Sequence, residues 1–320
     1  MRSVNAAQVA AYLAVIGTGG FRSAAARLGV TQGAVSQQVR RLEAELGASL
    51  IQRGPDGCRP APGTEAFARY ARTLADVADR AARLFRDPEL VVGAASNIGT
   101  YLLQPLIKTI GEMHSGRYRI RQYLGTNSDV VDGLALGAVD VAITEWWDHR
   151  PGFEATRWRE EDLVVIAGPG HRWWRRGRVT VAELAGETIL GGEPASGTGT
   201  LLRTVFGDAA ARLPAAVNLG STAAVKEAVH AGLGVSLVLA AAVQPEVAAG
   251  RLCTLSLDGP ALRKSLWIAR PAALVPADPA ALFTQAFLAA AVLPGGGSER
   301  RCRRMMSGIG RRQRMNWQGC

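Results

Sequence analysis

The stretch from Phe21 to Arg53 constrains the fold of this chain most, because its pattern is typical of two helices joined by a tight turn. Ser23 is the expected N-cap of a short helix over 24–28, since a hydroxyl there can accept from an unpaired backbone N–H. Thr31 has the same expected role at the start of a second helix, which runs to about Leu46. A strand-like wing is expected after this helix.

The second helix has two unlike faces. Its apolar residues recur three and four positions apart and predict one buried side, formed by Val35, Val39, Leu42 and Leu46. The opposite side carries amides, a hydroxyl and guanidinium groups without a carboxylate, at Gln32, Ser36, Gln37, Arg40 and Arg41. An ordinary solvated helix face is the alternative, which the short helix and the turn before it disfavour.

These features together predict that the second helix enters the major groove of DNA. Glutamine can bond the edge of adenine, and arginine can bond guanine or a phosphate. Residues near the helix start would meet bases, whereas Arg40 and Arg41 would meet phosphates. The residues predicted to contact DNA are Ser23, Thr31, Gln32, Gly33, Ser36, Gln37, Arg40, Arg41 and Arg53.

Positive charge is concentrated at the two ends of the chain. The net charge is +10, and residues 1–88 hold 12 arginines against seven acidic residues. Residues 295–320 hold seven arginines against one acidic residue, while the middle of the chain is close to neutral. The positive potential therefore lies where phosphate binding would use it.

The four cysteines form no recognisable framework. None of them has C-x-x-C spacing, so we expect neither a metal site nor a disulfide scaffold, and no cofactor. The longest apolar run, Ala231–Val243, is too short to span a bilayer, and the first residues do not form a signal peptide. The expected location is therefore the cytoplasm, away from any membrane.

Residues 64–87 contain neither glycine nor proline and predict one long amphipathic helix, with Thr64 as its expected N-cap. Its apolar stripe is close to that of a coiled-coil seam and consists of Phe67, Tyr70, Leu74, Val77, Ala81 and Leu84. Packing of this stripe against the chain's own body is the alternative; we favour pairing with a second copy. Two-fold pairing would set two DNA-reading helices one DNA turn apart, or a multiple of it, which predicts an interrupted palindrome as target.

From Glu89 onward, strands and helices alternate, which predicts sheets flanked by helices in two lobes with a cleft between them. The expected strands are 90–94, 119–124, 139–144, 163–167, 188–190, 216–219, 235–239 and 266–269. The expected helices are 99–113, 128–137, 200–206, 222–231 and 279–292. The acidic run of residues 160–162 is interpreted as a solvated turn.

Short polar segments lie between strand ends and helix starts, and together they predict a binding site in this cleft. Helix N-termini offer unpaired N–H groups and a partial positive charge, which suit a carboxylate, phosphate or sulfate. Capping alone is the alternative for each single residue, since Ser, Thr and Asn are the usual caps. The candidate residues for a small, polar, anionic ligand are Ser96, Asn97, Thr100, Thr126, Asn127, Ser196, Gly197, Thr198 and Thr222.

The N-terminal segment resembles the LysR-type transcriptional regulators. The family's opening pattern is carried here by Val9, Tyr12, Val15, Phe21, Ala24–Ala25, Leu28, Thr31–Gln32, Ala34–Val35–Ser36, Gln38–Val39, Leu42–Glu43, Leu46–Gly47, Leu50 and Arg53. The segment 92–103 is similar to a subgroup whose effector domain starts I-G-A-S-x-T-I-G-x-Y-L-L-P. Gly33 stands in place of a usual Pro, Gln37 in place of a common Arg, and Gly199 in place of the Arg that ends a later family loop.

The resemblance implies an α/β protein with three functional parts. These are a mainly α winged helix-turn-helix over 1–63, a linker and dimerisation helix over 64–88, and a two-lobe effector domain over 89–294 that is like periplasmic binding proteins. The implied partners are double-stranded DNA, a small-molecule effector, further copies of the chain as a dimer or tetramer, and RNA polymerase. The expected function is sequence-specific transcription regulation controlled by an effector bound between the lobes.

An α/β enzyme or a solute-binding protein with an appended DNA-binding domain is the alternative. An enzyme would need a nucleophile–base pair or a metal cluster, and a solute-binding protein would need an export signal; the sequence provides none of these. We therefore expect no catalytic and no metal-binding residues. Residues 295–320, rich in Gly, Arg and Met, are interpreted as a disordered basic tail that either adds phosphate contacts or has no role.

Overall fold

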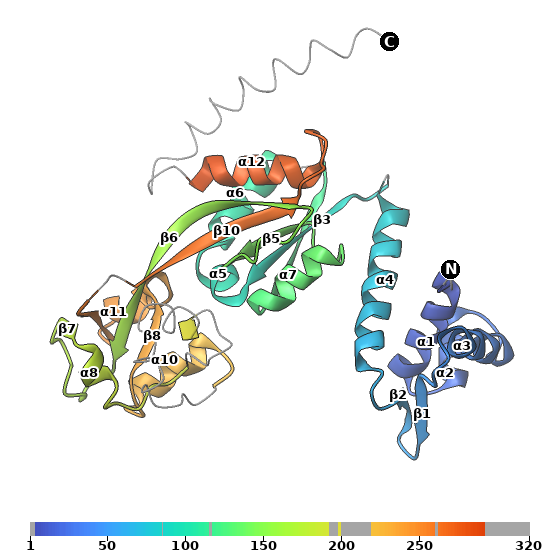
Figure 1. Cartoon of the computed structure of the whole chain (residues 1–320), viewed down its shortest axis with the longest axis horizontal. Helices are drawn as coiled ribbons and strands as arrows, with labels where there is room; N and C mark the ends of the chain where they lie inside the picture. Colours follow the sequence, from blue (N-terminus) through green and yellow to red (C-terminus); the bar gives the residue numbers. More distant parts are fainter. Residues whose placement is uncertain are drawn as a thin grey trace, which may run out of the picture. The chain divides into compact units, whose positions relative to one another are not determined.

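The computed structural model describes residues 4–84, 86–114, 117–191, 198–199, 219–259 and 262–291. They form two compact units (Figure 1): the first extends to Glu89 and includes Leu136–Ala138, and the second contains the other described residues. Our predictions for residues 196–197, 200–206, 216–218 and 295–320 lie outside the described residues.

The first unit is a set of helices with a two-stranded wing. In chain order it contains α1 (Ala6–Thr18), α2 (Phe21–Leu28), α3 (Gln32–Leu46), β1 (Ile51–Gly54), β2 (Gly57–Pro60) and α4 (Glu65–Arg83). One apolar core joins α1, α3 and α4, in which Tyr12 and Leu42 are fully buried and Phe67 meets the ring of Tyr12 edge-on at 5.4 Å. The expected helix-turn-helix and wing are therefore confirmed as structure.

One expected helix cap in this unit is wrong, and a second is correct in position but makes no capping hydrogen bond. α2 begins at Phe21 after Gly20, so Ser23 lies inside its first turn, where it is exposed and caps nothing. Phe21 packs on the core, which explains why the helix starts earlier than the position of a capping hydroxyl suggests. Thr64 precedes α4, but its hydroxyl donates to Ala61 O at 2.6 Å instead of capping the helix.

The second unit contains one twisted sheet that passes through two lobes. Its strands are β3 (Glu89–Ala95), β4 (Arg119–Gly125), β5 (Val141–Thr144), β6 (Phe153–Ala167), β7 (Arg178–Val179), β8 (Ser236–Leu239), β9 (Cys253–Leu257) and β10 (Arg263–Pro271). The order is β4-β3-β5-β10-β6-β9-β7, with β8 beside β6. The long antiparallel pair β6–β10 runs from one lobe to the other (Figure 1); it is paired from Phe153–Pro271 to Asp162–Arg263, with one register shift between Leu266 and Trp267.

Helices cover the sheet in both lobes. The first lobe holds α5 (Ser96–Tyr101), α6 (Gln104–Met113), α7 (Asn127–Ala135) and α12 (Pro279–Ala291); the second holds α8 (Val181–Leu184), α10 (Thr222–His230), the 3₁₀ turn η2 (Ala240–Ala242) and α11 (Gln244–Ala248). Successive side chains of strand β3 point to opposite faces of the sheet, and both faces are covered. Leu90 and Val92 pack with α6 and α12, whereas Val91 belongs to the core beside α7.

Several predicted elements of this unit need correction. The single helix over 99–113 is two helices, α5 and α6, and Pro105 lies in the first turn of α6, where its missing N–H is harmless. Of the expected strand 188–190, only a bridge between Ile189 and Val235 forms. Residues 160–162 are part of β6, with Glu161 buried, and not a solvated turn. The elements α8, α11, β7 and β9 were not predicted.

Candidate functional site

The start of α3 presents polar groups to solvent. Thr31 caps this helix as expected, because its Oγ1 accepts from Ala34 N at 3.2 Å. Of the residues predicted to contact DNA, Ser36 is half-buried, and the others are exposed: Ser23, Thr31, Gln32, Gly33, Gln37, Arg40, Arg41 and Arg53. The opposite face of α3 is buried at Val35, Val39 and Leu42. The helix therefore packs through its apolar face and leaves its polar face accessible to a partner.

The two carboxylates of α3 are turned towards the body of the unit. Glu43 Oε1 accepts from Leu50 N at 2.8 Å and thereby holds the segment that leads into the wing. Glu45 Oε1 accepts from the amide of Gln8 on α1 at 3.1 Å. The outer face of the helix is therefore left with amides and guanidinium groups, a set that suits base edges and phosphates.

The wing carries Arg53 beside the helix-turn-helix. Its guanidinium carbon lies 4.9 Å from the centroid of the Phe21 ring at the start of α2, a cation–π contact that limits where this exposed side chain can go. Arg59 on the facing strand pairs with Asp56 in the wing turn at 2.5 Å. Arg53 is thus an exposed cation whose position next to α2 is restrained, which suits a contact with a DNA phosphate.

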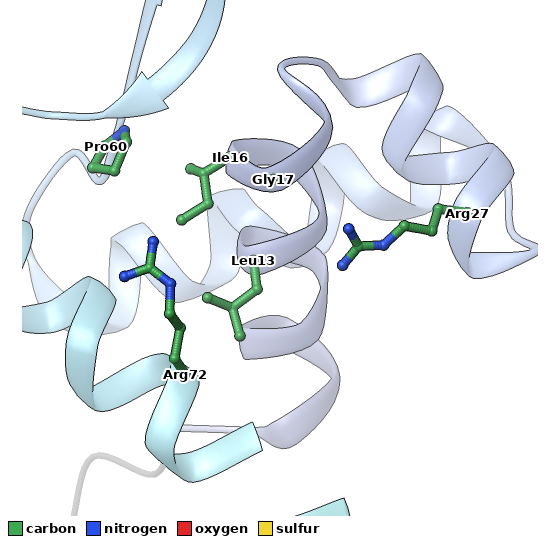
Figure 2. A pocket seen from close by; sticks show the side chains of 6 residues that line it. All are labelled: Leu13, Ile16, Gly17, Arg27, Pro60 and Arg72. Carbon is green, nitrogen blue, oxygen red and sulfur yellow. The ribbon is translucent and has the colours of Figure 1, made fainter. Parts of the chain in front are cut away.

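A shallow hollow of about 310 Å³ lies on the first unit between α1 and α4 (Figure 2). Leu13 and Ile16 of α1 form its apolar wall, and the guanidinium groups of Arg27 and Arg72 lie on either side of α1. Arg27 and Arg72 are therefore two surface cations of this unit that are not among the residues predicted to contact DNA.

A larger cavity of about 660 Å³ lies between the two lobes of the second unit. The first lobe contributes the start of α5, the turn before α7, and Glu145 after β5; the second contributes the start of α10 and strand β8. Seven of the predicted ligand-binding residues line it, namely Ser96, Asn97, Thr100, Thr126, Asn127, Thr198 and Thr222. Ser196 and Gly197 lie outside the described residues.

Some of these side chains have structural partners of their own. Thr126 and Asp129 cap α7 reciprocally, since Thr126 N donates to the carboxylate and Asp129 N donates to the hydroxyl, both at 3.1 Å. Asn127 accepts from Glu145 N at 2.7 Å and donates to Trp146 O at 3.2 Å. Thr126 therefore caps a helix, and Asn127 holds the backbone after β5, without the need for a ligand.

Two residues that the sequence did not single out, Glu145 and Lys264, form a buried ion pair at this cavity. Asn97 Nδ2 donates to Glu145 Oε1 at 3.3 Å, and Thr222 Oγ1 from the second lobe donates to Asn97 Oδ1 at 2.7 Å. Lys264 Nζ also donates to Thr198 Oγ1 at 3.2 Å. The polar groups of both lobes are therefore joined in one hydrogen-bonded chain.

A second contact between the lobes involves Tyr101, which also lines the cavity. The ammonium group of Lys226 on α10 is 4.9 Å from the ring centroid of Tyr101, the last residue of α5. Lys226 also donates to Ala242 O at 2.8 Å and to Glu246 Oε1 at 2.5 Å. Tyr101 packs against the core of the second lobe, so movement of the lobes would disturb this cluster.

A winged helix-turn-helix joined to a two-lobe domain with an internal cavity defines a DNA-binding regulator with a ligand-binding domain. Residues 6–65 match the bacterial regulatory helix-turn-helix protein family lysR, and residues 86–291 match the LysR substrate binding domain. The chain belongs to the LysR family of transcription regulators, and the resemblance in the sequence is thereby confirmed.

Named relatives agree with this assignment. The chain is 33% identical over 300 residues to the HTH-type transcriptional regulator CbbR of Xanthobacter flavus, covering 89% of each chain. It is 41% identical over 186 residues to the regulator protein PtxE of Stutzerimonas stutzeri, covering 58% of this chain and 95% of the relative. Both relatives are named as HTH-type transcriptional regulators.

The fold is similar to that of the LysR family regulator CbnR. The solved structure of full-length CbnR complexed with its target DNA has a TM-score of 0.66, with 22% identity over 90% of this chain and 100% of CbnR. The expected α/β architecture with an N-terminal helix-turn-helix is therefore confirmed. None of the described helices is long and apolar enough to cross a membrane, and the described residues contain no cluster of potential metal ligands.

Proposed function

We propose that α3 reads a specific DNA site through Gln32, Gly33, Ser36 and Gln37, while Arg40, Arg41 and Arg53 bind the flanking phosphates. The observation that carries this proposal is the outer face of α3, from which Glu43 and Glu45 are withdrawn by hydrogen bonds to the body of the unit. A helix with this surface meets an acidic, hydrogen-bonding groove without a repelling carboxylate. Ser23 and Thr31 at the turn would contribute sugar–phosphate contacts.

Footprinting on the region upstream of the gene tests this proposal. We expect protection of an interrupted palindrome, because two copies paired by their α4 helices would present two α3 helices to one side of the duplex. Protection of a single half-site, or of no site, would contradict it. The same experiment separates a regulator from an enzyme or solute-binding protein with an appended domain, since neither needs a palindrome.

We further propose that the cavity binds a small, polar, anionic metabolite that controls DNA binding. The helices α7 and α10 both start at this cavity, and each N-terminus carries a partial positive charge that suits an anion. In this structure the hydroxyls of Ser96, Thr100 and Thr222 donate to Gly125 O, Ser96 O and Asn97 Oδ1, so they would redirect these hydrogens to the ligand when it binds. Asn127 would add the amide hydrogen that it does not donate to Trp146 O. Ser196, Gly197 and Thr198 belong to the same proposal.

Calorimetric titration with small carboxylic acids and inorganic oxyanions tests the cavity. Thr100→Val is the informative variant, because Thr100 lines the cavity while its hydroxyl donates only to Ser96 O within α5. Thr109→Val is its matched control, since the Thr109 hydroxyl makes the same bond to Pro105 O within α6, away from the cavity. We expect weaker binding for Thr100→Val and Ser196→Ala only; unchanged affinity in both would remove them from the site.

The proposal extends to assembly and cellular context. The exposed side chains of Tyr70 and Leu74 on α4, and of Leu84 directly after it, are a surface for a second copy, in a dimer or tetramer. The regulator would act in the cytoplasm, on DNA and in contact with RNA polymerase. The proposed functional parts are residues 1–63 for DNA, 64–88 for pairing and 89–294 for the effector.

A further inference from the structure

Glu145 and Lys264 are the charged residues among the described residues that line the cavity between the lobes. Their side chains are only 8% and 4% exposed, and they form an ion pair with each other. The described lining therefore carries no net charge. An anion that enters the cavity is attracted by the starts of α7 and α10 but gains no net attraction from these two side chains, because it approaches a carboxylate as well as an ammonium group.

Among the described residues, the pair does not use its full hydrogen-bonding capacity. An ammonium group has three donors, and Lys264 Nζ donates to Glu145 and to Thr198, which leaves one donor without a partner in the described part of the chain. A carboxylate can accept about four hydrogen bonds, and Glu145 accepts one from Asn97 and one from Lys264 among the described residues. The pair therefore offers a ligand one donor and further acceptor positions side by side.

We infer that Glu145 and Lys264 select the ligand, and that the cavity takes an anion which also carries a hydrogen-bond donor. Such an anion is a hydroxy acid or an oxyanion that keeps a proton at neutral pH; this inference rests on the proposed effector site. An oxygen of the ligand accepts from Lys264, and its O–H donates to Glu145. The neighbouring helix starts and hydroxyls bind the remaining oxygens.

An anion without a donor is rejected for two reasons. It places lone pairs and negative charge against the Glu145 carboxylate, where the low local dielectric strengthens repulsion. It also leaves buried acceptor positions unpaired after water has been displaced. A site built to bond a hydroxyl discriminates strongly against an analogue that lacks it, more strongly than an apolar pocket discriminates by size.

The rival interpretation is that the pair only holds the two lobes together. The chain of bonds from Thr198 through Lys264, Glu145 and Asn97 to Thr222 does link the lobes. A purely structural pair would change stability and the affinity for every ligand together. If the pair selects the ligand, its mutation changes the ratio of the affinities for two ligands. If the pair is only structural, this ratio stays the same.

The test uses the full-length protein and two pairs of probes that differ by a proton or a hydroxyl. Inorganic phosphate is compared with sulfate, and glycolate with acetate, by calorimetry at neutral pH up to about 20 mM. We expect the donor-bearing member of one pair to bind about tenfold tighter or more. The pair that shows this preference identifies a protonated oxyanion or a hydroxy acid as the ligand class. In Glu145→Gln, which loses the charge but keeps the shape, the preference falls to near parity because the rejected member gains affinity.

The control is Glu154→Gln, which alters the Arg270–Glu154 pair outside the cavity lining and leaves the preference unchanged. Equal binding within both pairs, an unaltered preference in Glu145→Gln, or no binding by any probe overturns the inference. Equal binding within both pairs contradicts only the selection by Glu145, whereas no binding by any probe removes the proposed effector site as well. Footprinting of the same preparations tests the DNA-reading part of the proposed function separately.

Discussion

The backbone of Gly57 in the wing lies against the carbonyl group of Gly19, the residue that ends α1. A Cβ atom on Gly57 would be 2.6 Å from Gly19 O, and the φ of Gly57 is +105°, a region that L side chains rarely adopt. The next residue, Cys58, donates its N–H to the same Gly19 O at 2.8 Å. The wing is therefore anchored to the helical part of the unit through a contact that only glycine allows.

Gly57→Ala should displace the wing, because alanine is strained at this φ and its methyl group would overlap the Gly19 carbonyl. We expect a loss of about 1–3 kcal/mol in the free energy of unfolding. DNA affinity should fall alike for specific and random sequences, since the wing carries the cation Arg53. Gly54→Ala in the same hairpin is the control, because its nearest neighbour would be 3.9 Å away. Equal denaturation midpoints for the two variants would show that the close approach has no cost.

The helix-turn-helix could be predicted because local signals there agree with the packing. The cap Thr31, the positive-φ Gly29 and the buried stripe of α3 all depend on residues close in sequence. The start of α2 was placed wrongly, since Phe21 packs against a core that is assembled from residues between Val9 and Ala71. Local capping preference lost to tertiary packing at this point.

The long strand β6 was only partly predicted, for a related reason. Its part from Phe153 to Asp162 is rich in charged residues and ends in an acidic run, and Glu161 is buried beside Arg159 and opposite Lys264 of β10. In sequence, an acidic run favours a turn. Only pairing with β10, which follows about 100 residues later, makes this segment a strand.

The ligand-binding candidates were found by their positions at helix starts, whereas Glu145 and Lys264 were missed. Their partnership spans 119 residues, which no local pattern can indicate. One signal was present: only three of the 37 basic residues are lysines. Two of them, Lys226 and Lys264, are buried in Lys–Glu pairs. In an arginine-rich chain such as this one, the few lysines were therefore candidates for buried ion pairs, in which a compact ammonium group is used instead of a guanidinium group.

The outward stripe of α4 should control self-association. Ala68 and Ala71 of this helix are buried in the first unit's core, while Tyr70 and Leu74 are 53% and 44% exposed. Leu74→Glu puts a charge into a coiled-coil-like seam and should shift the protein to a lower oligomeric state. Analytical ultracentrifugation over a range of concentrations measures this change. Arg69→Gln alters the net charge by the same amount off the stripe and should leave the oligomer intact; dissociation of both variants alike would argue against the seam.

Stability should fall on mild acidification because of His114. Burial, and then the nearby Arg117, lowers the pKa of this imidazole, which stacks on Tyr118 at 5.5 Å. A base with a lowered pKa in the folded state binds its proton more readily when unfolded, so this contribution is present above about pH 6.5 and is lost below it. His114→Gln should reduce the loss of unfolding free energy between pH 7.5 and 5.5 by about 1 kcal/mol or less. Urea unfolding at both pH values measures it, and an identical loss in the variant would assign the acid sensitivity elsewhere.

The division of labour between base reading and phosphate binding can be tested with one pair of variants. Gln32 is exposed in the first turn of α3, so Gln32→Ala should cost about 1–3 kcal/mol on the cognate palindrome and little on random DNA. Arg53 is held over Phe21 on the wing, so Arg53→Ala should weaken both complexes alike and lower the salt dependence of binding. Fluorescence anisotropy on matched cognate and scrambled duplexes, at several salt concentrations, separates the two effects. If Arg53→Ala lost specificity while Gln32→Ala lost only general affinity, Arg53 would be the residue that contacts bases and Gln32 the one that contacts the DNA backbone, contrary to the proposal.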